Sequence, residues 1–173
     1  TPYPVLGIVR RSDSTGAGAG HIRDPSTTSF RGAKADRLMT AVRTSSGTLR
    51  LIAWRVSALG GVARTANSGN QAGAATYIDI TRGPTSPTFV TACRTFSGKL
   101  RLIAWRHAGS AINRRGDSGN QAGAATQIKV EALTNTVYVS ACRTSSGILR
   151  LISWRLNANG SLTRLADSAN LAG

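Results

Sequence analysis

The sequence is poor in several residue types, and each shortage excludes a class of protein. Only 7 acidic residues stand against 22 lysines and arginines, so no carboxylate pair for glycoside hydrolysis and no acidic calcium loop can be found. The 2 cysteines and 2 histidines form no cluster with the spacing of a zinc site. No apolar run approaches the roughly 20 residues of a membrane-spanning helix. We therefore expect no metal, no cofactor and no insertion into a membrane.

The excess of basic residues gives the chain of 173 residues a net charge of +15. Such a charge favours anionic partners and repels other basic surfaces. Nucleic acid is one candidate partner, but the sequence contains no recognised groove-reading motif to support it. The basic residues are not gathered in a tail, and many of them recur at fixed intervals.

The chain is built from an internal repeat. Trp54, Trp105 and Trp154 lie in the near-identical runs LRLIAWR, LRLIAWR and LRLISWR, at spacings of 51 and 49 residues. An Arg-Thr pair and a Ser-Gly turn precede each run, and a polar loop of the type DSGNQAG follows it. A diverged copy of this loop begins at Asp13. A period of about 50 residues predicts a repeat architecture.

Each repeat contains four segments with the pattern of β-strands. In the last repeat we predict strands at residues 124–132, 136–144, 148–156 and 161–166, with Ser146-Gly147 as a two-residue hairpin turn. The third segment carries apolar residues on both faces, so a sheet made from it needs a neighbour on each side.

These features predict an all-β chain of propeller blades, each with four antiparallel strands. Three complete blades fit residues 19–66, 74–116 and 124–166, and an extra strand fits residues 4–11. Propellers have about four to eight blades, so the chain is expected to be part of a larger closed ring. A second copy would complete a six- or seven-bladed ring, or the remaining blades would come from another protein or from a further part of this chain.

The pattern RT-SG-LRLIAWR…DSGNQAGAA resembles the repeat of a group of bacterial β-propeller proteins, many of them secreted. It is more distantly similar to tryptophan–aspartate repeat propellers, whose histidine and Trp-Asp signatures it lacks. The resemblance covers residues 38–173 well and 5–22 weakly. It implies the fold, and it leaves the function open because propellers host lectins, scaffolds and enzymes. With the start at Thr1-Pro2, which suggests a processed chain, it gives the expectation of an extracellular or periplasmic location.

The first repeat differs from the others between Ile22 and Leu38. The segment IRDPSTTSFRGAKADRL takes the place of a clean inner strand and a short connection. It is interpreted as a loop insertion, or alternatively as a docking loop for a partner, since insertions in repeat arrays usually lie on one face.

Two short motifs resemble catalytic or nucleotide-binding signatures. GDSGN at residues 116–120 resembles the surroundings of a serine-protease nucleophile, but the sister loops at Asn67 and Asp167 indicate a recurrent turn. GAGAG at residues 16–20 lacks the Gly-Lys-Ser/Thr ending of a phosphate-binding loop. We predict no catalytic residues and no enzymatic activity.

Arginines give the first candidate binding site. If each Ser-Gly pair forms a two-residue turn, the arginine before it faces the arginine after it, and such like-charge pairs need compensation. The candidate internal partners are Asp13, Asp117 and Asp167, with Asn67 as the exception. The alternative is a bound anion such as phosphate, sulfate or an acidic glycan. The predicted pairs are Arg43 with Arg50, Arg94 with Arg101, and Arg143 with Arg150.

The three tryptophans give the second candidate site. An exposed Trp54, Trp105 or Trp154 could stack on a sugar, whereas a buried one would fill the space between neighbouring blades. Cys93 and Cys142 occupy equivalent positions of adjacent repeats, where the spacing of packed sheets of about 10 Å exceeds the reach of a disulfide. We expect them to be buried, unbonded thiols.

The sequence thus favours a non-catalytic binding or assembly module with repeat-equivalent sites for a carbohydrate or anionic ligand. The alternative is a purely structural accessory subunit that docks on the acidic surface of a larger complex.

Overall fold

A computed structural model describes residues 23–31, 36–84 and 87–169 of the chain. All regular elements of these residues are β-strands, so the described part contains no helix able to span a membrane. The prediction of an all-β chain is confirmed here, while the predicted strand at residues 4–11 lies outside the described residues. The strands are β1 (Arg23–Arg31), β2 (Asp36–Arg43), β3 (Thr48–Val56), β4 (Val62–Asn67), β5 (Gln71–Arg82), β6 (Thr88–Thr95), β7 (Leu100–Ala108), β8 (Ala111–Asp117), β9 (Ala125–Ala132), β10 (Val137–Thr144), β11 (Leu149–Leu156) and β12 (Leu162–Asp167).

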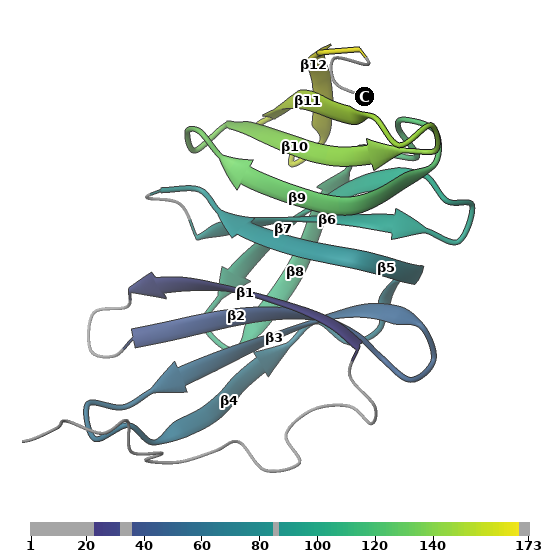
Figure 1. Ribbon diagram of the computed structural model, residues 1–173. Coiled ribbons are helices and arrows are strands. Elements are labelled where there is room, and N and C mark those ends of the chain that lie inside the picture. The colour runs from purple at the N-terminus through teal and green to yellow at the C-terminus, as the bar shows by residue number, and fades with distance from the viewer. Residues whose placement is uncertain (1–22, 32–35, 85–86, 170–173) are drawn as a thin grey trace, which may run out of the picture.

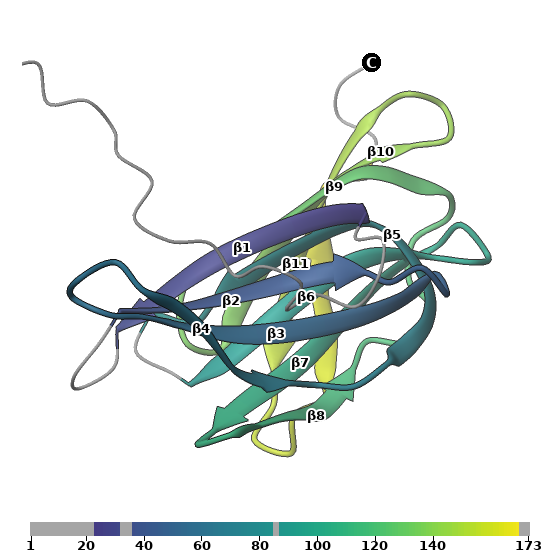
Figure 2. The same cartoon turned by 90° about the horizontal axis from the view of Figure 1, so that it is seen from below.

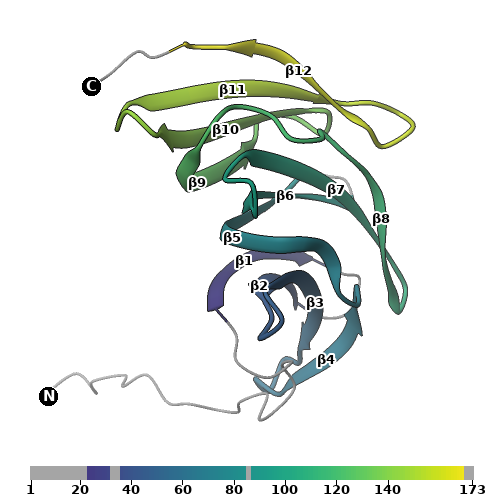
Figure 3. The same cartoon turned by 90° about the vertical axis from the view of Figure 1, so that its right-hand side faces the viewer.

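The strands form three antiparallel four-stranded units, which we number along the chain. Unit 1 contains β1–β4, unit 2 contains β5–β8, and unit 3 contains β9–β12. The units are stacked in order in Figure 1. Figure 3 shows them from the side, with β4 and β8 on the side opposite β5 and β9. Each unit therefore packs on the next through the faces of its sheet.

Backbone hydrogen bonds join consecutive units at the hairpin between the second and third strands. The N–H of Ala75 in unit 2 donates to the carbonyl of Gly47 in unit 1 at 2.9 Å, and Ala125 does the same to Gly98 at 2.9 Å. A short ladder between β3 and β5 extends the first join, so units 1 and 2 share one sheet. The polar loop after each unit thus returns along that unit's hairpin before the next unit starts.

The alternation of side chains along the third strand of each unit gives the unit two different apolar faces. The tryptophan face carries Val42, Ile52 and Trp54 in unit 1, Cys93, Ile103 and Trp105 in unit 2, and Cys142, Ile152 and Trp154 in unit 3. The leucine face carries Leu49 and Leu51 in unit 1, Leu100 and Leu102 in unit 2, and Leu149 and Leu151 in unit 3.

The two cores between units are formed by unlike faces. The leucine face of unit 1 packs against the tryptophan face of unit 2 in one cluster, and the leucine face of unit 2 packs against the tryptophan face of unit 3 in the other. Each fully buried leucine contributes about 1.5–3 kcal/mol relative to an exposed one. The prediction that a sheet apolar on both faces needs two neighbours is thus met at these two junctions.

The segment expected to be a loop insertion forms a strand. β1 pairs with β2 from Arg23↔Arg43 to Arg31↔Asp36, with a register shift between Arg23 and Ser26. Pro25 falls within that irregularity, where a residue without an N–H is tolerated in a sheet. The interpretation of residues 23–31 as a loop was therefore wrong, and the docking-loop alternative loses its basis there.

Candidate functional site

The hairpins between the second and third strands differ from the predicted two-residue turns. In all three units a three-residue loop joins the two strands. In unit 1 the N–H of Thr44 donates to the carbonyl of Thr48 and the N–H of Gly47 donates to the carbonyl of Thr44, both at 2.9 Å. The loop glycines Gly47, Gly98 and Gly147 have φ angles of 82°, 80° and 84°. Glycine at the left-handed position of a three-residue loop is a common hairpin arrangement.

This loop shifts the strand register and separates the arginines that were predicted to pair. Arg101 faces Cys93 across the ladder, and Arg94 faces Leu100. The equivalent arginines of unit 1 (Arg50 and Arg43) and of unit 3 (Arg150 and Arg143) have the same register. The two arginines of each hairpin thus lie on opposite faces of the sheet, so the like-charge pairs of the sequence-based hypothesis do not form.

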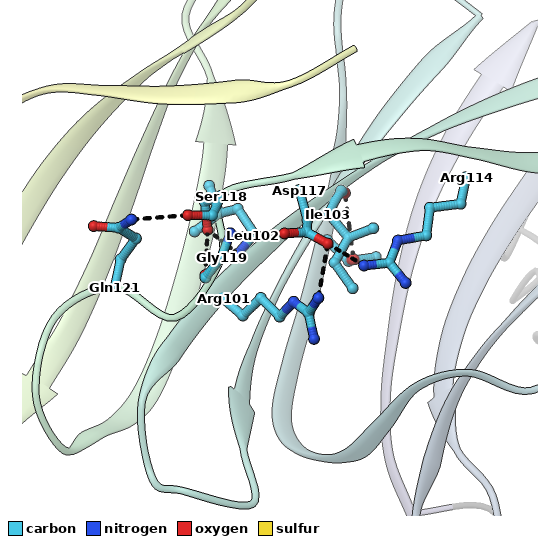
Figure 4. Close-up of polar contacts among 9 residues, drawn as sticks. Arg101, Leu102, Ile103, Arg114, Asp117, Ser118, Gly119 and Gln121 are labelled. Carbon is cyan, nitrogen blue, oxygen red and sulfur yellow. Dashed lines mark hydrogen bonds and ion pairs between the residues drawn. The ribbon is translucent and has the colours of Figure 1, made fainter.

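Arg101 is neutralised by Asp117, the last residue of β8 (Figure 4). Its Nη2 donates to Oδ2 of Asp117 at 2.7 Å, and Arg114 pairs with the same oxygen. Burial tends to raise the pKa of the Asp117 carboxyl, but the Gly119 N–H and the two guanidinium groups outweigh it and hold the pKa below 3.8. The prediction of an internal carboxylate partner is confirmed for Arg101.

Unit 3 repeats this arrangement and unit 1 modifies it. Nη2 of Arg150 donates to Oδ2 of Asp167 at 2.9 Å. In unit 1 the acid is replaced by Asn67, and Arg50 instead donates from Nε and Nη2 to Oδ1 of Asn70, at 3.1 and 2.5 Å. The repeat therefore keeps a polar partner for this arginine but removes the negative charge in unit 1.

The serine of each polar loop has a structural role. Oγ of Ser118 accepts the N–H of Leu102 at 3.0 Å and donates to the carbonyl of Gly119 at 2.9 Å. The Asp117 carboxylate accepts a hydrogen bond from the N–H of Gly119, two residues later, at 2.7 Å. This is the side-chain-to-backbone turn that the sequence predicted. Equivalent bonds hold Ser68 and Ser168. These contacts explain GDSGN as a turn without recourse to catalysis.

The other arginine of each hairpin packs on its loop. A Cβ atom built on Gly98 would lie 3.3 Å from Nη2 of Arg94, and on Gly147 it would lie 3.2 Å from Nη2 of Arg143. Arg43 covers Gly47 in the same way. No guanidinium group of the three forms an ion pair or a hydrogen bond with another residue of the described chain. They are the unneutralised members of the candidate arginines.

The three tryptophans fill space between strands and units. Trp105 and Trp154 have an exposed fraction of 0%, and Trp54 has 8%. Each indole donates to a hydroxyl on the preceding strand: Trp105 to Thr91 at 2.9 Å, and Trp154 to Ser140 at 2.8 Å. Because the rings of Trp105 and Trp154 do not reach the surface, they offer no platform for stacking on a sugar. The packing alternative agrees with their positions.

Two surface recesses occupy equivalent places in units 2 and 3. One of about 180 Å³ is lined by residues 122–124, the hairpin residues 144–146, Cys142 and Arg150. The other, of about 490 Å³, is lined by residues 72–74, the hairpin residues 95–97, Arg101 and Arg114, and Asn120. Each combines backbone of the polar linker, hydroxyl groups of the hairpin and the arginine that is paired with the loop carboxylate.

Both cysteines are free and buried, as predicted. Burial raises the pKa of the Cys93 thiol to about 12, against a smaller opposing effect of Arg101 and Arg114, and it also raises the pKa of Cys142. Such thiols are poor nucleophiles and poor metal ligands. The described part of the chain contains no group of three or more His, Cys, Asp or Glu that could hold a metal ion.

The leucine face of unit 3 is open to solvent. Leu149 and Leu151 are 45% and 40% exposed, whereas their counterparts in units 1 and 2 are 0% exposed. Leu165 on β12 adds a third side chain with 45% exposed. In the ribbon, β10–β12 lie at the end of the stack (Figure 1). The surface that joins unit 1 to unit 2 and unit 2 to unit 3 is therefore repeated once more without a described neighbour.

The opposite end of the stack is different. Val42 and Ile52, on the tryptophan face of unit 1, are 2% and 1% exposed, and Trp54 is packed with them and with Leu38 and Val62. This face is closed, so of these two outer sheet faces it is the leucine face of unit 3 that exposes its apolar side chains.

One polar contact between units 2 and 3 could not be predicted from the repeat pattern. Oδ2 of Asp79 on β5 accepts the N–H of Val130 on β9 at 2.9 Å, and Lys129 lies 3.6 Å from Oδ1. Asp79 is 8% exposed. An acid between Ile78 and Ile80 was the only hint in the sequence, because the partner is 51 residues away.

The sequence matches no protein-family model and no curated protein sequence. Among solved structures, the fold is similar to that of Sqt1 from Saccharomyces cerevisiae, with 9% identity and a TM-score of 0.54 over 90% of this chain and 40% of Sqt1. The complex of SREBP and SCAP binding domains from fission yeast aligns with a TM-score of 0.36 and 10% identity, over 80% of this chain and 52% of the other. The chain thus spans less than half of Sqt1, and the likeness concerns the fold alone.

Proposed function

We propose that the chain is a non-catalytic assembly module that binds another protein through the leucine face of unit 3. The observation that carries this proposal is the exposure of Leu149 and Leu151, whose four counterparts are fully buried by a following unit. Exposed contiguous apolar surface on a sheet face is typical of protein interaction sites. Because the tryptophans are buried and the loop serines have structural roles, this face is the main apolar surface of the repeat without a described neighbour.

The occupant that fits this face is a further four-stranded unit with a tryptophan face. The two junctions inside the chain both join a leucine face to a face with isoleucine and tryptophan at its centre. A partner unit of that chemistry from another chain would bury the open leucines in the same way, because the tryptophan faces within this chain are already buried. Addition of units in this manner leads to a closed ring when about four to eight have been assembled.

Double substitution Leu149→Lys with Leu151→Lys tests the proposal. We expect the parent protein to show a mass above 18.0 kDa in light scattering, or to retain a separate chain during purification. The double variant should return to 18.0 kDa and lose that chain, with unchanged β-sheet content by circular dichroism. Multiples of 18.0 kDa identify a second copy as the source, and a second band identifies another chain.

The matched control is Leu133→Lys, because Leu133 is 61% exposed but lies in the turn after β9 rather than on the leucine face. It should leave the association unchanged. A parent protein that is a stable 18.0 kDa monomer at micromolar concentration with no retained chain would overturn the proposal.

A second candidate function is the binding of an anionic or carbohydrate ligand in the repeat-equivalent recesses of units 2 and 3. Its support is that the same linker, hairpin and arginine line both recesses, and that the chain carries a net charge of +15. Since Arg101 and Arg150 are each already paired with a carboxylate, the proposal requires a ligand that uses their remaining N–H groups. Saturable binding on an array of sulfated and neutral glycans, lost in Arg150→Leu, would support it. No binding on the array would leave the assembly role alone.

A further inference from the structure

The groove between units 2 and 3 contains a second kind of arginine site, at the end of the sheet opposite the hairpins. A recess of about 250 Å³ is lined by Pro87, Thr88, Arg106 and Arg115 of unit 2 and by Leu156, Asn157, Ala158 and Gly160 of unit 3. The turn between β11 and β12 lies beside β8 in both Figure 2 and Figure 3. The recess is thus formed by two units and exists because they are packed together.

A β-bulge directs Arg115 into this groove. Ala104 pairs with Gly116 and Trp105 pairs with Arg114, so Arg115 is the extra residue of β8 and has no partner on β7. A Cβ atom built on Gly160 would lie 2.6 Å from Cβ of Arg115, which places the base of the Arg115 side chain against unit 3. Bulges commonly redirect a side chain in this way.

The wall of the groove is held by close backbone packing. A Cβ atom built on Gly116 would lie 2.6 Å from the carbonyl oxygen of Gly160, closer than side chains allow. Two glycines at this contact let β8 and the turn of unit 3 approach each other directly. The positions of Arg115 and of the 157–160 backbone are therefore fixed relative to each other before any ligand binds, which favours tight recognition.

The charge of this recess is not neutralised. The side chains of Arg106 and Arg115 form no ion pair or hydrogen bond with any other described residue, and no carboxylate is among the residues that line the recess. Arg101 and Arg114, on the other face of the same unit, share Asp117. Unit 2 therefore has one arginine pair with an internal partner and another without one.

The second arginine is a departure from the repeat. The bulge residue is Thr65 in unit 1 and Leu165 in unit 3, whereas Arg106 has the counterparts Arg55 and Arg155. The hydroxyl of Thr65 donates a hydrogen bond to the carbonyl of Ala53 at 3.2 Å. The combination of an arginine after the tryptophan with an arginine at the bulge therefore occurs in unit 2 and not in units 1 and 3.

We propose that this groove binds a phosphate or sulfate monoester, with Arg106 and Arg115 holding the oxyanion. Two guanidinium groups offer planar sets of N–H donors that suit the oxygens of such a group. The volume is several times the roughly 30 Å³ that a water molecule occupies in the liquid. It therefore leaves space for a small organic substituent beside Leu156 and Pro87. The site goes beyond the assembly role and does not depend on the leucine face.

Calorimetric titration with phenyl phosphate, phenyl sulfate and inorganic phosphate, at constant ionic strength set with sodium chloride, tests the site. We expect saturable binding of one ester with at least tenfold preference over inorganic phosphate. Arg115→Leu, which installs the residue of unit 3 at this position, and Arg106→Gln should each weaken that binding at least tenfold. The preference for phenyl phosphate or phenyl sulfate identifies the oxyanion.

The matched control is Arg155→Gln, which removes the counterpart of Arg106 in a unit whose bulge residue is Leu165. It should change the affinity less than twofold, and so should the Leu149→Lys, Leu151→Lys double variant. Arg115→Leu is expected to fold, because the equivalent bulge position holds threonine in β4 and leucine in β12. A melting curve of the variant checks this. Absence of saturable ester binding, equal binding of inorganic phosphate, or equal losses in Arg155→Gln and Arg106→Gln would each overturn the proposal.

Discussion

Units 2 and 3 begin their third strands with the same Leu-Arg-Leu sequence, but the leucines have different surroundings. Leu100 and Leu102 are buried against the tryptophan face of unit 3, while Leu149 and Leu151 face solvent. The comparison shows that the burial of a leucine in this repeat depends on the neighbouring unit and not on the local sequence alone. A leucine in this repeat becomes part of a core only when another unit is added, as is general for repeat proteins.

The largest expected difference is between truncations of equivalent leucines. Leu102→Ala should lower the free energy of unfolding by about 2–5 kcal/mol, because it leaves a cavity in a closed core. Leu151→Ala should cost less than about 1 kcal/mol in the separate chain, since surface substitutions have small effects. Urea unfolding of both variants measures the difference.

Leu133→Ala serves as the surface control for this pair, with 61% of the side chain exposed. Equal losses for Leu102→Ala and Leu151→Ala would contradict the difference in burial. If unit 3 is covered in the assembled protein, the cost of Leu151→Ala should rise with protein concentration, which sharpens the comparison.

The polar loops of units 1 and 2 give an effect of intermediate size. Asp117→Asn copies Asn67 of unit 1: it retains an oxygen for the N–H of Gly119 but loses the charge opposite Arg101 and Arg114. We expect a loss of about 1 kcal/mol at neutral pH, given that these groups are partly exposed. Thermal melts of parent and variant give the measurement.

The pH dependence identifies the carboxylate as the cause. Because the pKa of Asp117 in the folded chain is lower than 3.8, its stabilisation is complete above that value and is lost as the pH falls through the folded pKa. The gap between parent and Asp117→Asn should therefore close at low pH. A gap that stays constant down to strongly acid pH would show that the ion pairs are not responsible. Asn67→Asp should have the opposite effect on stability.

The smallest expected effect concerns the loop after the fourth strand. Ala169 has a φ of 53°, where units 1 and 2 have Gly69 and Gly119 with φ of 68° and 66°. Ala169→Gly removes the steric cost of a left-handed alanine, partly offset by the greater freedom of glycine when unfolded. A gain of about 0.5 kcal/mol in urea unfolding is expected, and Ala158→Gly, in the turn of the same unit, should give none.

Much of the fold could be predicted because the repeat places equivalent residues in equivalent positions. The four strands predicted for unit 3 agree with β9–β12 to within one residue at each end. The strand β1 was missed, because Pro25 indicates a break, whereas its pairing with β2 depends on residues farther along the chain.

The error in the candidate site came from one residue of loop length. A two-residue turn of the common type needs positive φ at both positions, which suits Ser46 poorly, whereas a three-residue loop needs it only at Gly47. Turn chemistry thus favoured the observed register. The groove at Arg115 could not be predicted, since it depends on a bulge and on the packing of two units.

The glycine contact between units 2 and 3 has a consequence for how the chain folds. Neighbouring units of nearly the same sequence can exchange strands or associate in the wrong order, and such misassembly is a characteristic failure of repeat proteins. The counterparts of Gly116 in units 1 and 3 are Ala66 and Ala166. Gly116 leaves room for the turn at Gly160, whereas the Cβ atom of an alanine at this position would collide with that turn. The Asp79–Val130 bond is likewise specific, as unit 3 has Lys129 in place of Asp79. These two contacts mark unit 3 as the successor of unit 2 and thereby give a nearly uniform array a defined order.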